Sequence, residues 1–192
     1  MASICGPRRA MGQSRAGGPA SATARSALWW CAGLASLGLA ADVAGKAWAE
    51  SALRGGHRIT AAGGLLRFQL VINHGASLGL GAGFEPVLAL ASLPGVVLLG
   101  FWAARGASRL ERSGAAIAAA GAAGNFLDRL ARSPAPLHGG VVDWIHVSFY
   151  GPTFNLADLW LRGGLLAAVG AWMWHHRRKP VDPPDPAVPQ VR

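Results

Sequence analysis

The run VLALASLPGVVLLGFWAA, from Val87 to Ala104, decides the fold class. It holds 18 consecutive residues without a charged side chain. A helix that crosses the roughly 30 Å hydrocarbon core of a membrane needs about 20 mostly apolar residues, within a range of about 17–25. The run therefore predicts a transmembrane helix.

Three further apolar blocks accompany this run. Ala27–Trp48 fits the same length range, whereas Gly114–Leu127 and Leu159–Trp174 reach it only if their polar ends enter the membrane. We predict that all four blocks cross the membrane. The expected fold class is therefore membrane all-α, with a four-transmembrane-helix bundle that occupies residues 27–176.

Basic residues separate the apolar blocks and do not form one patch. The chain is 52% hydrophobic, 14% charged and has a net charge of +9, whereas soluble domains carry about 25% charged residues. Most Arg and Lys lie before the first block, between the second and third blocks, and after the fourth. Because positively charged segments stay in the cytoplasm, both termini are expected there. No nucleic-acid partner is expected, since that would need the basic residues on one folded face.

The two ends of the chain differ from the blocks in composition. Residues 1–26 are rich in Gly, Ser, Ala and Arg, and residues 177–192 contain repeated prolines. Both are predicted to be disordered cytoplasmic tails. The small-x-small sequence at 47–49 also suggests a cleavable secretory signal. Asp42 and Lys46 would interrupt the region before that cut, and three apolar blocks follow it, so we favour a retained helix.

The two longer connections, about 50–84 and 128–158, are then expected on the outer face. Leu66–Asn73 alternates apolar and polar side chains, which predicts a half-buried strand. Val141–Phe149 is rich in β-branched and aromatic residues and is a candidate partner strand. We expect these loops to form a small extracytoplasmic β-sheet on the bundle.

The third block has a face of small residues. Gly114, Ala118, Gly121 and Ala122 recur at helical spacing. Small residues in such positions allow neighbouring helix backbones to approach closely. We therefore expect this helix to pack tightly against another helix.

Four aspartates lie near the outer ends of the predicted helices. Asp42, Asp128, Asp143 and Asp158 are four of the nine acidic residues in the chain. A carboxylate within a bilayer costs about 2.5–3.5 kcal/mol at a helix centre on insertion scales, so such residues are candidates for function. Their concentration at one membrane depth predicts a site there.

Two aspartates that lie close together can hydrolyse a peptide bond. Because they cannot both ionise, they share one proton. The ionised carboxylate takes a proton from water, and the protonated one donates to the substrate. This chemistry needs no cofactor or metal, and the two Cys and six His show no metal-ligand spacing. The residues alone leave open which two aspartates form the pair.

Five sequence blocks together resemble the signature blocks of the lipoprotein signal peptidase family. They are, in order, Asp42 with Lys46; NHGASLG, residues 73–79; GAAGNFLDR, residues 121–129; VVDW, residues 141–144; and FNLAD, residues 154–158. Each block is short, but all five occur in the family's order and at the expected helix ends. Together they cover about residues 40–175.

The resemblance implies a catalytic pair of Asp143 and Asp158. It also implies a substrate, a prolipoprotein signal peptide bearing a diacylglyceryl-cysteine, cut on the amino side of that cysteine. The enzyme is expected to be a monomer in the bacterial cytoplasmic (inner) membrane, in contact with membrane lipid and with its active site at the outer face. Substrate-binding or supporting roles are implied for Asp42, Lys46, Asn73, Gly75, Asn125, Asp128, Arg129, Asn155 and Ala157.

Structural roles compete with these assignments. Asp42 and Lys46 are four residues apart and can form an ion pair on one helix face. Asn73 before Gly75 is also compatible with an ordinary turn, and Asn155 or Asp158 can cap the fourth helix.

The third block leaves two further alternatives open. Asn125 and Arg129 lie one helical turn apart and can bridge helices as well as contact substrate. Asp128, beside Arg129, is an alternative catalytic acid that the family pattern makes a supporting residue.

The sequence departs from the family pattern at three positions. Val43 stands where Gln is usual, Ser77 where a second Ala is usual, and Leu78 where an aromatic residue is usual. The stretch between the two expected catalytic aspartates is also a few residues shorter than usual. These differences bear on the outer loop over the substrate and leave both aspartates in place.

Three other functions are considered. A non-catalytic polytopic protein, such as a transporter subunit or assembly factor, could use the aspartates as an ion path. A transporter would favour an internal repeat, and none is visible. An aspartyl protease acting on other signal peptides, or a catalytically inactive relative, would also share the composition, but the order of the blocks and the presence of both aspartates argue against them.

Overall fold

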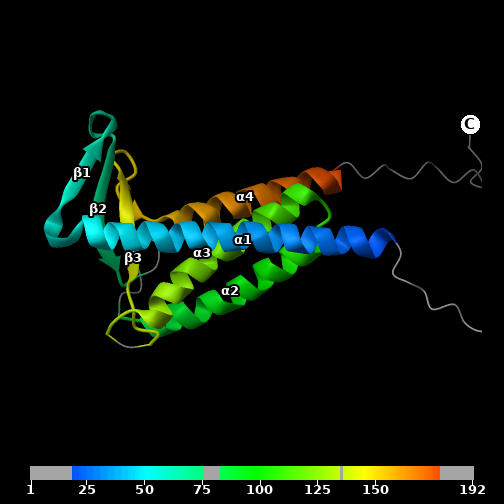
Figure 1. Ribbon diagram of the computed structural model, residues 1–192, viewed down its shortest axis with the longest axis horizontal. Coiled ribbons are helices and arrows are strands. Elements are labelled where there is room, and N and C mark those ends of the chain that lie inside the picture. The colour runs from blue at the N-terminus through cyan, green and yellow to red at the C-terminus, as the bar shows by residue number, and fades with distance from the viewer. Residues whose placement is uncertain (1–18, 76–82, 135, 178–192) are drawn as a thin grey trace, which may run out of the picture.

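The structure is a computed structural model, and it describes residues 19–75, 83–134 and 136–177. Within these residues the helices alternate in direction, and the strands gather at one end of the helix bundle (Figure 1). The order along the chain is α1 (Pro19–Ala52), β1 (Arg58–Ala61), β2 (Leu66–Asn73), α2 (Glu85–Arg105), α3 (Arg109–Ala131), β3 (Val141–Val147), β4 (Thr153–Phe154) and α4 (Leu156–Arg177).

Helix α1 begins earlier than the composition indicates. The helix begins at Pro19, within the segment 1–26 whose composition predicts a tail. Proline is tolerated in the first turn of a helix, and the Ala-rich segment that follows has no glycine until Gly33. The rest of the predicted tail, residues 1–18, and residues 178–192 lie outside the described residues. At its other end α1 continues through Ala49, which is fully buried, so the candidate cleavage sequence at 47–49 lies inside a packed helix.

Two of the described helices, α1 over Arg25–Ala52 and α2, are long and apolar enough to cross a membrane. Helix α3 lies among the other helices, packing against α1, α2 and α4, and its Ala115 and Ala118 are fully buried. Its alanines and glycines therefore serve close packing more than contact with lipid. A membrane crossing by α3 and α4 stays a prediction.

Helix α3 also begins earlier than the predicted block at Gly114–Leu127. Ser108 caps it, because the Ser108 hydroxyl accepts a hydrogen bond from the Glu111 backbone N–H at 3.1 Å. The Glu111 carboxylate in turn accepts from the Trp102 indole N–H of α2 at 2.6 Å. A polar first turn is thus buried against α2, which the apolar pattern does not reveal.

The small-residue face of α3 packs against α4, as predicted. An added Cβ at Gly114 would lie 2.7 Å from the backbone oxygen of Gly164 and 2.7 Å from the backbone nitrogen of Ala168. At Gly121 it would lie 2.6 Å from the backbone nitrogen of Leu161 and closer still to the carbonyl oxygen of Ala157. The two backbones therefore touch, and this contact holds the first turn of α4 in place.

Replacement of Gly121 by Ala should separate these helices. Backbone atoms cannot swing aside as a side chain can, so we expect Gly121→Ala to destabilise the protein by about 3 kcal/mol, the upper end of typical overpacking costs. The measurement is unfolding in detergent followed by circular dichroism. Gly163→Ala on α4 is the matched control, since its Cβ would meet nothing within 4 Å, and it should be neutral or stabilising. Equal stability of both variants would contradict the close packing.

The predicted sheet is present and is antiparallel, with strand order β1-β2-β3-β4. Strand β2 has the predicted bounds, and its partner is β3, with Phe68 opposite Ile145 and Val71 opposite Asp143. The pairing register shifts between Phe68 and Val71. Strands β1 and β4 were not predicted. The sheet places Asp143 on an inner strand, flanked by β2 and β4.

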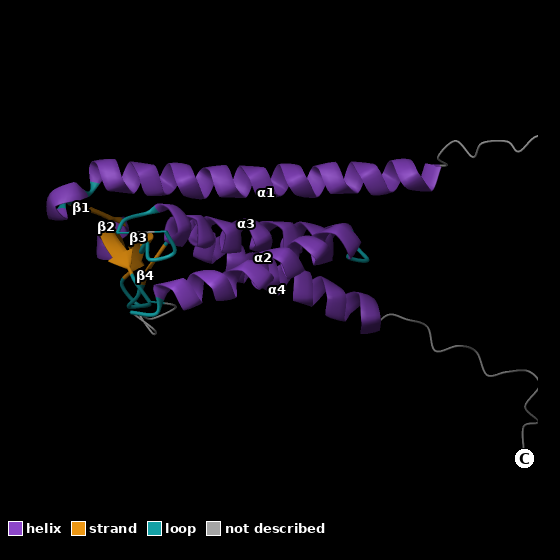
Figure 2. Ribbon diagram, turned by 90° about the horizontal axis from the view of Figure 1, so that it is seen from below, coloured by secondary structure: helices purple, strands orange, loops and turns teal. Residues whose placement is uncertain are grey.

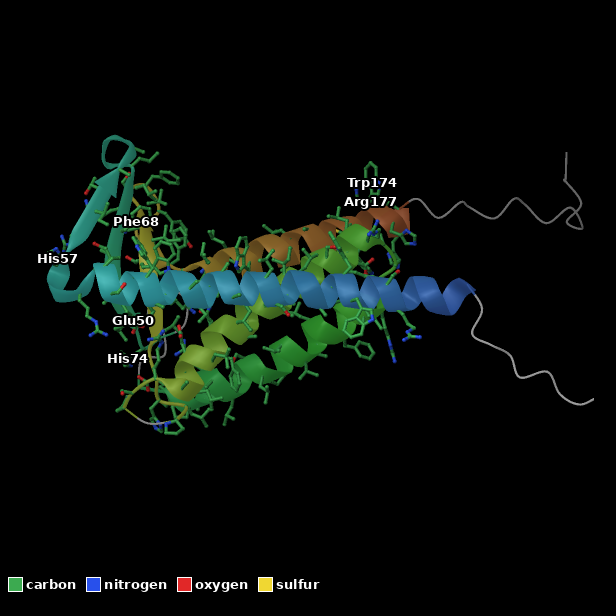
Figure 3. The ribbon with its side chains drawn as sticks, viewed as in Figure 1. Glu50, His57, Phe68, His74, Trp174 and Arg177 are labelled. Carbon is green, nitrogen blue, oxygen red and sulfur yellow. The ribbon has the colours of Figure 1, made fainter. Side chains whose placement is uncertain are left out.

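The end of α1 carries this sheet. Ala49 and Leu53 pack with Val142 of β3, and the Trp144 ring lies 5.3 Å from the Trp48 ring, centroid to centroid. Figure 2 shows α1 running along one side of the other three helices toward the strands. In Figure 3, Phe68 and Glu50 lie at the sheet end of the bundle, whereas Trp174 and Arg177 lie at the opposite end.

Candidate active site

Asp143 and Asp158 line one cavity of about 400 Å³ between the sheet and the helices. Asp143 comes from β3 and is 2% exposed. Asp158 lies in the first turn of α4, which the contact with α3 holds against the bundle. Segments from separate parts of the chain therefore bring the two predicted catalytic residues to one cavity.

Two amides hold the Asp143 carboxyl. Asn73 Nδ2 donates to Asp143 Oδ2 at 2.9 Å, and Asn155 Nδ2 donates to Asp143 Oδ1 at 2.7 Å. The pKa of Asp143 is raised to about 7; burial raises it most, the Asn73 hydrogen bond opposes this, and the charge of Asp158 raises it again. Asp143 can therefore hold a proton near neutral pH.

The Asn73 side chain combines both roles considered for it. Its Nδ2 holds Asp143, while its Oδ1 accepts a hydrogen bond from the Gly75 backbone N–H at 2.9 Å. The second bond is the local turn that the sequence suggests. Because the Asn73 amide oxygen already accepts from Gly75, the turn also ensures that the NH₂ end of the amide points to the Asp143 carboxyl.

Asn155 caps α4 and connects the two carboxyls. Its Oδ1 accepts from the Asp158 backbone N–H at 2.9 Å, the arrangement of an N-cap. Its Nδ2 donates to Asn125 Oδ1 at 3.1 Å as well as to Asp143. Asn125 Nδ2 then donates to Asp158 Oδ1 at 2.9 Å. Both carboxyls are thus fixed by one chain of amides.

Lys46 sets the direction of this amide chain. Its Nζ donates to Asn125 Oδ1 at 3.2 Å, and the group is 1% exposed. An ammonium can only donate, so Asn125 must present its oxygen to Lys46 and its N–H to Asp158. The predicted ion pair with Asp42 is also present, with Nζ 2.7 Å from Asp42 Oδ2.

Asp42 and Asp128 neutralise the buried Lys46. Lys46 Nζ lies 2.8 Å from Asp128 Oδ2. Asp42 Oδ1 accepts from the Ala157 backbone N–H at 2.8 Å, so this aspartate also holds the first turn of α4. Asp42 is completely buried and Asp128 is 7% exposed. The cluster links α1 and α3 to the first turn of α4.

Asp128 is occupied by structural partners. Besides Lys46 it accepts from Arg132 Nε at 2.7 Å and from the Val142 backbone N–H at 3.2 Å, and it does not line the cavity. Arg132 also pairs with Glu50 near the end of α1. Arg132 and Glu50 were not predicted from the sequence. The position of Arg132, four residues after Asp128, could have indicated an ion pair on one helix face.

Arg129 reaches the cavity from α3. Its Nη2 donates to the Gly75 carbonyl oxygen at 2.6 Å. Its Nη1 is buried and has no hydrogen-bond partner among the described residues, and the residue lines the cavity. The guanidinium is therefore held beside the cavity by its bond to Gly75.

The cavity has both polar and apolar lining residues. Besides the carboxyls, Asn73, Asn125 and Arg129 line it, and Leu88 and Leu99 of α2 add apolar surface. This combination suits an extended peptide, which has polar main-chain groups, next to an apolar segment. Within the described residues, no group of three or more His, Cys, Asp or Glu is placed to hold a metal ion.

Two of the three departures from the family pattern, Ser77 and Leu78, lie outside the described residues. The Val43 side chain is 51% exposed on α1 and does not line the cavity, so the change from Gln leaves the site intact. Every supporting residue implied by the resemblance belongs to the hydrogen-bonded group around Asp143 and Asp158.

Asp143 and Asp158 line one cavity, in a bundle of which two described helices are long and apolar enough to cross a membrane; this combination is typical of the class of membrane aspartic peptidases. The family model described as signal peptidase (SPase) II matches residues 34–174. The chain belongs to this signal peptidase II family, and the expectation of a lipoprotein signal peptidase is confirmed.

Individual relatives agree with this family. The chain is 38% identical to the lipoprotein signal peptidase of Bifidobacterium longum subsp. infantis over 137 residues, 71% of this chain and 73% of that one. It is 36% identical to the enzyme of that name from Mycobacterium avium over 132 residues, 68% of this chain and 71% of that one. A bacterial membrane enzyme solved by the in meso method at 2.3 Å resolution has the same fold, with a TM-score of 0.68, 22% identity, and coverage of 79% of this chain and 93% of that chain. These matches do not favour the non-catalytic alternative.

Proposed function

We propose that this enzyme removes the signal peptide from prolipoproteins by cutting on the amino side of a diacylglyceryl-cysteine, with Asp143 and Asp158 as the catalytic pair. The observation that carries the proposal is the amide chain that connects the two carboxyls lining one cavity. The family membership supplies the class of substrate.

The two carboxyls divide the work of hydrolysis between them. The pair holds one proton, because the charge of Asp158 opposes ionisation of Asp143. The ionised carboxylate takes a proton from water as the water oxygen attacks the scissile carbonyl carbon, and the protonated carboxyl donates to the carbonyl oxygen. When the C–N bond breaks, a carboxyl protonates the leaving amine. Water is the only co-reactant, so we propose that no cofactor takes part.

In this proposal Arg129 positions the substrate, and Asn73 positions the catalytic carboxyl of Asp143. Arg129 lines the cavity, and its guanidinium is proposed to donate to a main-chain carbonyl beside the scissile bond. Asn73 holds Asp143 in one orientation. Gly75 contributes its carbonyl oxygen to Arg129, which fixes the direction of the guanidinium.

The proposed topology has four membrane crossings with the sheet and the cavity at the outer face. Basic residues at the opposite end of the bundle support it: Arg105 ends α2, Arg109 begins α3, and Arg177 ends α4. By the positive-inside rule that end is cytoplasmic. We further propose that the enzyme acts as a monomer in contact with membrane lipid, without a nucleic-acid partner.

Substrate recognition can be tested with matched precursors. Purified enzyme in detergent should cleave a prolipoprotein that carries diacylglyceryl on its cysteine, and it should leave the same precursor without lipid uncut. In parallel, enzyme reconstituted in liposomes should carry no proton flux. Equal cleavage of both precursors would contradict the proposed substrate, and proton flux without cleavage would favour the ion-path alternative.

The activity should fall above about pH 7. The protonated member of the pair is needed as the acid, and the pKa of Asp143 is raised to about 7, so kcat/KM should decrease about tenfold per pH unit above that value. Asn73→Ala removes a hydrogen bond that lowers this pKa, and the falling limb should move to higher pH. The control is Gln69→Ala on β2, the strand that also carries Asn73; it removes a hydrogen bond to Thr153 of β4 and should leave the limb in place. An unmoved limb in Asn73→Ala would contradict the role of Asp143.

A further inference from the structure

A second cavity of about 420 Å³ adjoins the first beside Asp158. Its walls come from the end of β3, the turn that follows, β4 and the start of α4; Phe149, Tyr150, Phe154 and Leu159 supply most of the apolar surface. Asp158 and Arg162 line both cavities. Whatever occupies the second cavity therefore lies directly beside the proposed scissile bond.

One polar pair interrupts the apolar wall. Arg162 Nη1 donates to the Tyr150 hydroxyl oxygen at 2.6 Å, and the Tyr150 ring packs edge-on against Phe154 with centroids 5.8 Å apart. Arg162 lies about one helical turn beyond Asp158 on α4, a rise of about 6 Å. The side chain of Phe149 is 81% exposed. A cationic donor is thus held by an aromatic wall that remains open to its surroundings.

This chemistry differs from that of the first cavity. Main-chain peptide groups need both donors and acceptors, which the amides and Arg129 of the first cavity supply. The second cavity offers the N–H groups of Arg162 and a hydroxyl beside broad aromatic surface. Fatty-acid esters match it, because their carbonyl oxygens only accept hydrogen bonds and their chains are apolar. An open aromatic wall also lets a long chain continue into the surrounding lipid.

We propose that the second cavity binds the diacylglyceryl group of the substrate cysteine, with an ester carbonyl on Arg162 and Tyr150 and one acyl chain along Phe149 and Phe154. The inference rests on the proposed function. It makes Arg162 and Tyr150 specificity residues, which recognise the lipid and take no part in the chemical step. The cysteine on the leaving side of the scissile bond then lies next to Asp158, which both cavities share.

Ester and ether substrates of equal chain length test the proposal. The probes are two prolipoprotein peptides whose cysteine carries either a diacylglyceryl group or a dialkylglyceryl group, which lacks the ester carbonyls. A hydrogen bond from a charged donor changes affinity by about tenfold, so the parent enzyme should show a KM about tenfold lower for the ester. Arg162→Met should bring the ratio of the two KM values to about one. Because the contact is made equally in the ground and transition states, kcat for the ester should change little.

Two controls keep the outcome clear. Arg105→Met removes an arginine that stacks on Phe101 at the far end of α2, and it should keep the parent's ester preference. The unfolding temperature of Arg162→Met, measured beside the parent, shows that the variant is folded. Equal KM values for ester and ether in the parent, or an ester preference retained in Arg162→Met, would overturn the inference while cleavage itself still supports the proposed function. Failure of the parent to cut the ester substrate would instead contradict the proposed function.

Discussion

Asp143→Asn and Asp158→Asn should each lower kcat for prolipoprotein cleavage by about 10³-fold, within the usual range for removing a general acid or base. Each amide is nearly the size of the carboxyl it replaces, but it can neither share the proton nor activate water. In Asp143→Asn the new N–H₂ group must also face one of two amide donors, since Asn73 and Asn155 donate to both oxygens. The measurement is single-turnover cleavage of the lipid-modified precursor.

A matched acid-to-amide control separates this effect from a change in charge at the sheet end of the bundle. Glu85→Gln lies in the first turn of α2, outside the group that lines the first cavity, and should keep the parent's rate. Unfolding temperatures of all three variants show whether they are folded. Activity equal to the parent's in either aspartate variant would disprove the assigned pair, and Asp128 would be the next residue to replace.

Lys46→Met should destabilise the protein by about 3–5 kcal/mol, the usual cost of removing one partner of a buried ion pair. The variant keeps the length of the side chain but leaves Asp42 and Asp128 buried without their shared cation. It also removes the donor that orients Asn125 toward Asp158. We therefore expect lower activity even in the fraction that remains folded. The free energy of unfolding in a denaturant titration measures the first effect.

A second substitution should recover part of the lost stability. In Lys46→Met with Asp42→Asn the uncompensated negative charge on α1 is gone, while the amide oxygen can still accept from the Ala157 backbone N–H. Stability should rise relative to Lys46→Met alone, and cleavage should remain impaired because Asn125 stays unoriented. A Lys46→Met variant as stable as the parent would contradict the account of this buried cluster.

Helices and strands with an uninterrupted pattern of apolar residues could be predicted from the sequence. Helix α2 follows from the uncharged run at Val87–Ala104, and β2 follows from the alternation at Leu66–Asn73; both are present. The beginning of α3 was missed because its polar first turn is buried by contacts with Trp102 of α2. Strand β4 has only two residues, too few to show a period. Contacts between distant segments decide such ends, and a local pattern does not contain them.

In the candidate site, too, some features could be predicted from the sequence and others depend on contacts between distant segments. Resemblance could identify the residues around Asp143 and Asp158, and the spacing of Asp42 and Lys46 predicted their ion pair. The link from Lys46 through Asn125 to Asp158 joins α1, α3 and α4, so only the packed bundle reveals it. The Arg162 contact with Tyr150 likewise depends on the turn after β3; from the sequence, Arg162 was an isolated charge within an apolar block.

The most direct measurement is the mass of the products when the purified enzyme acts on a diacylglyceryl-modified prolipoprotein in excess EDTA. We expect two products, the free signal peptide and a protein that begins with the lipid-bearing cysteine, at a rate that EDTA does not change. No cleavage by folded enzyme, cleavage at another bond, or complete inhibition by EDTA would contradict a two-aspartate lipoprotein signal peptidase.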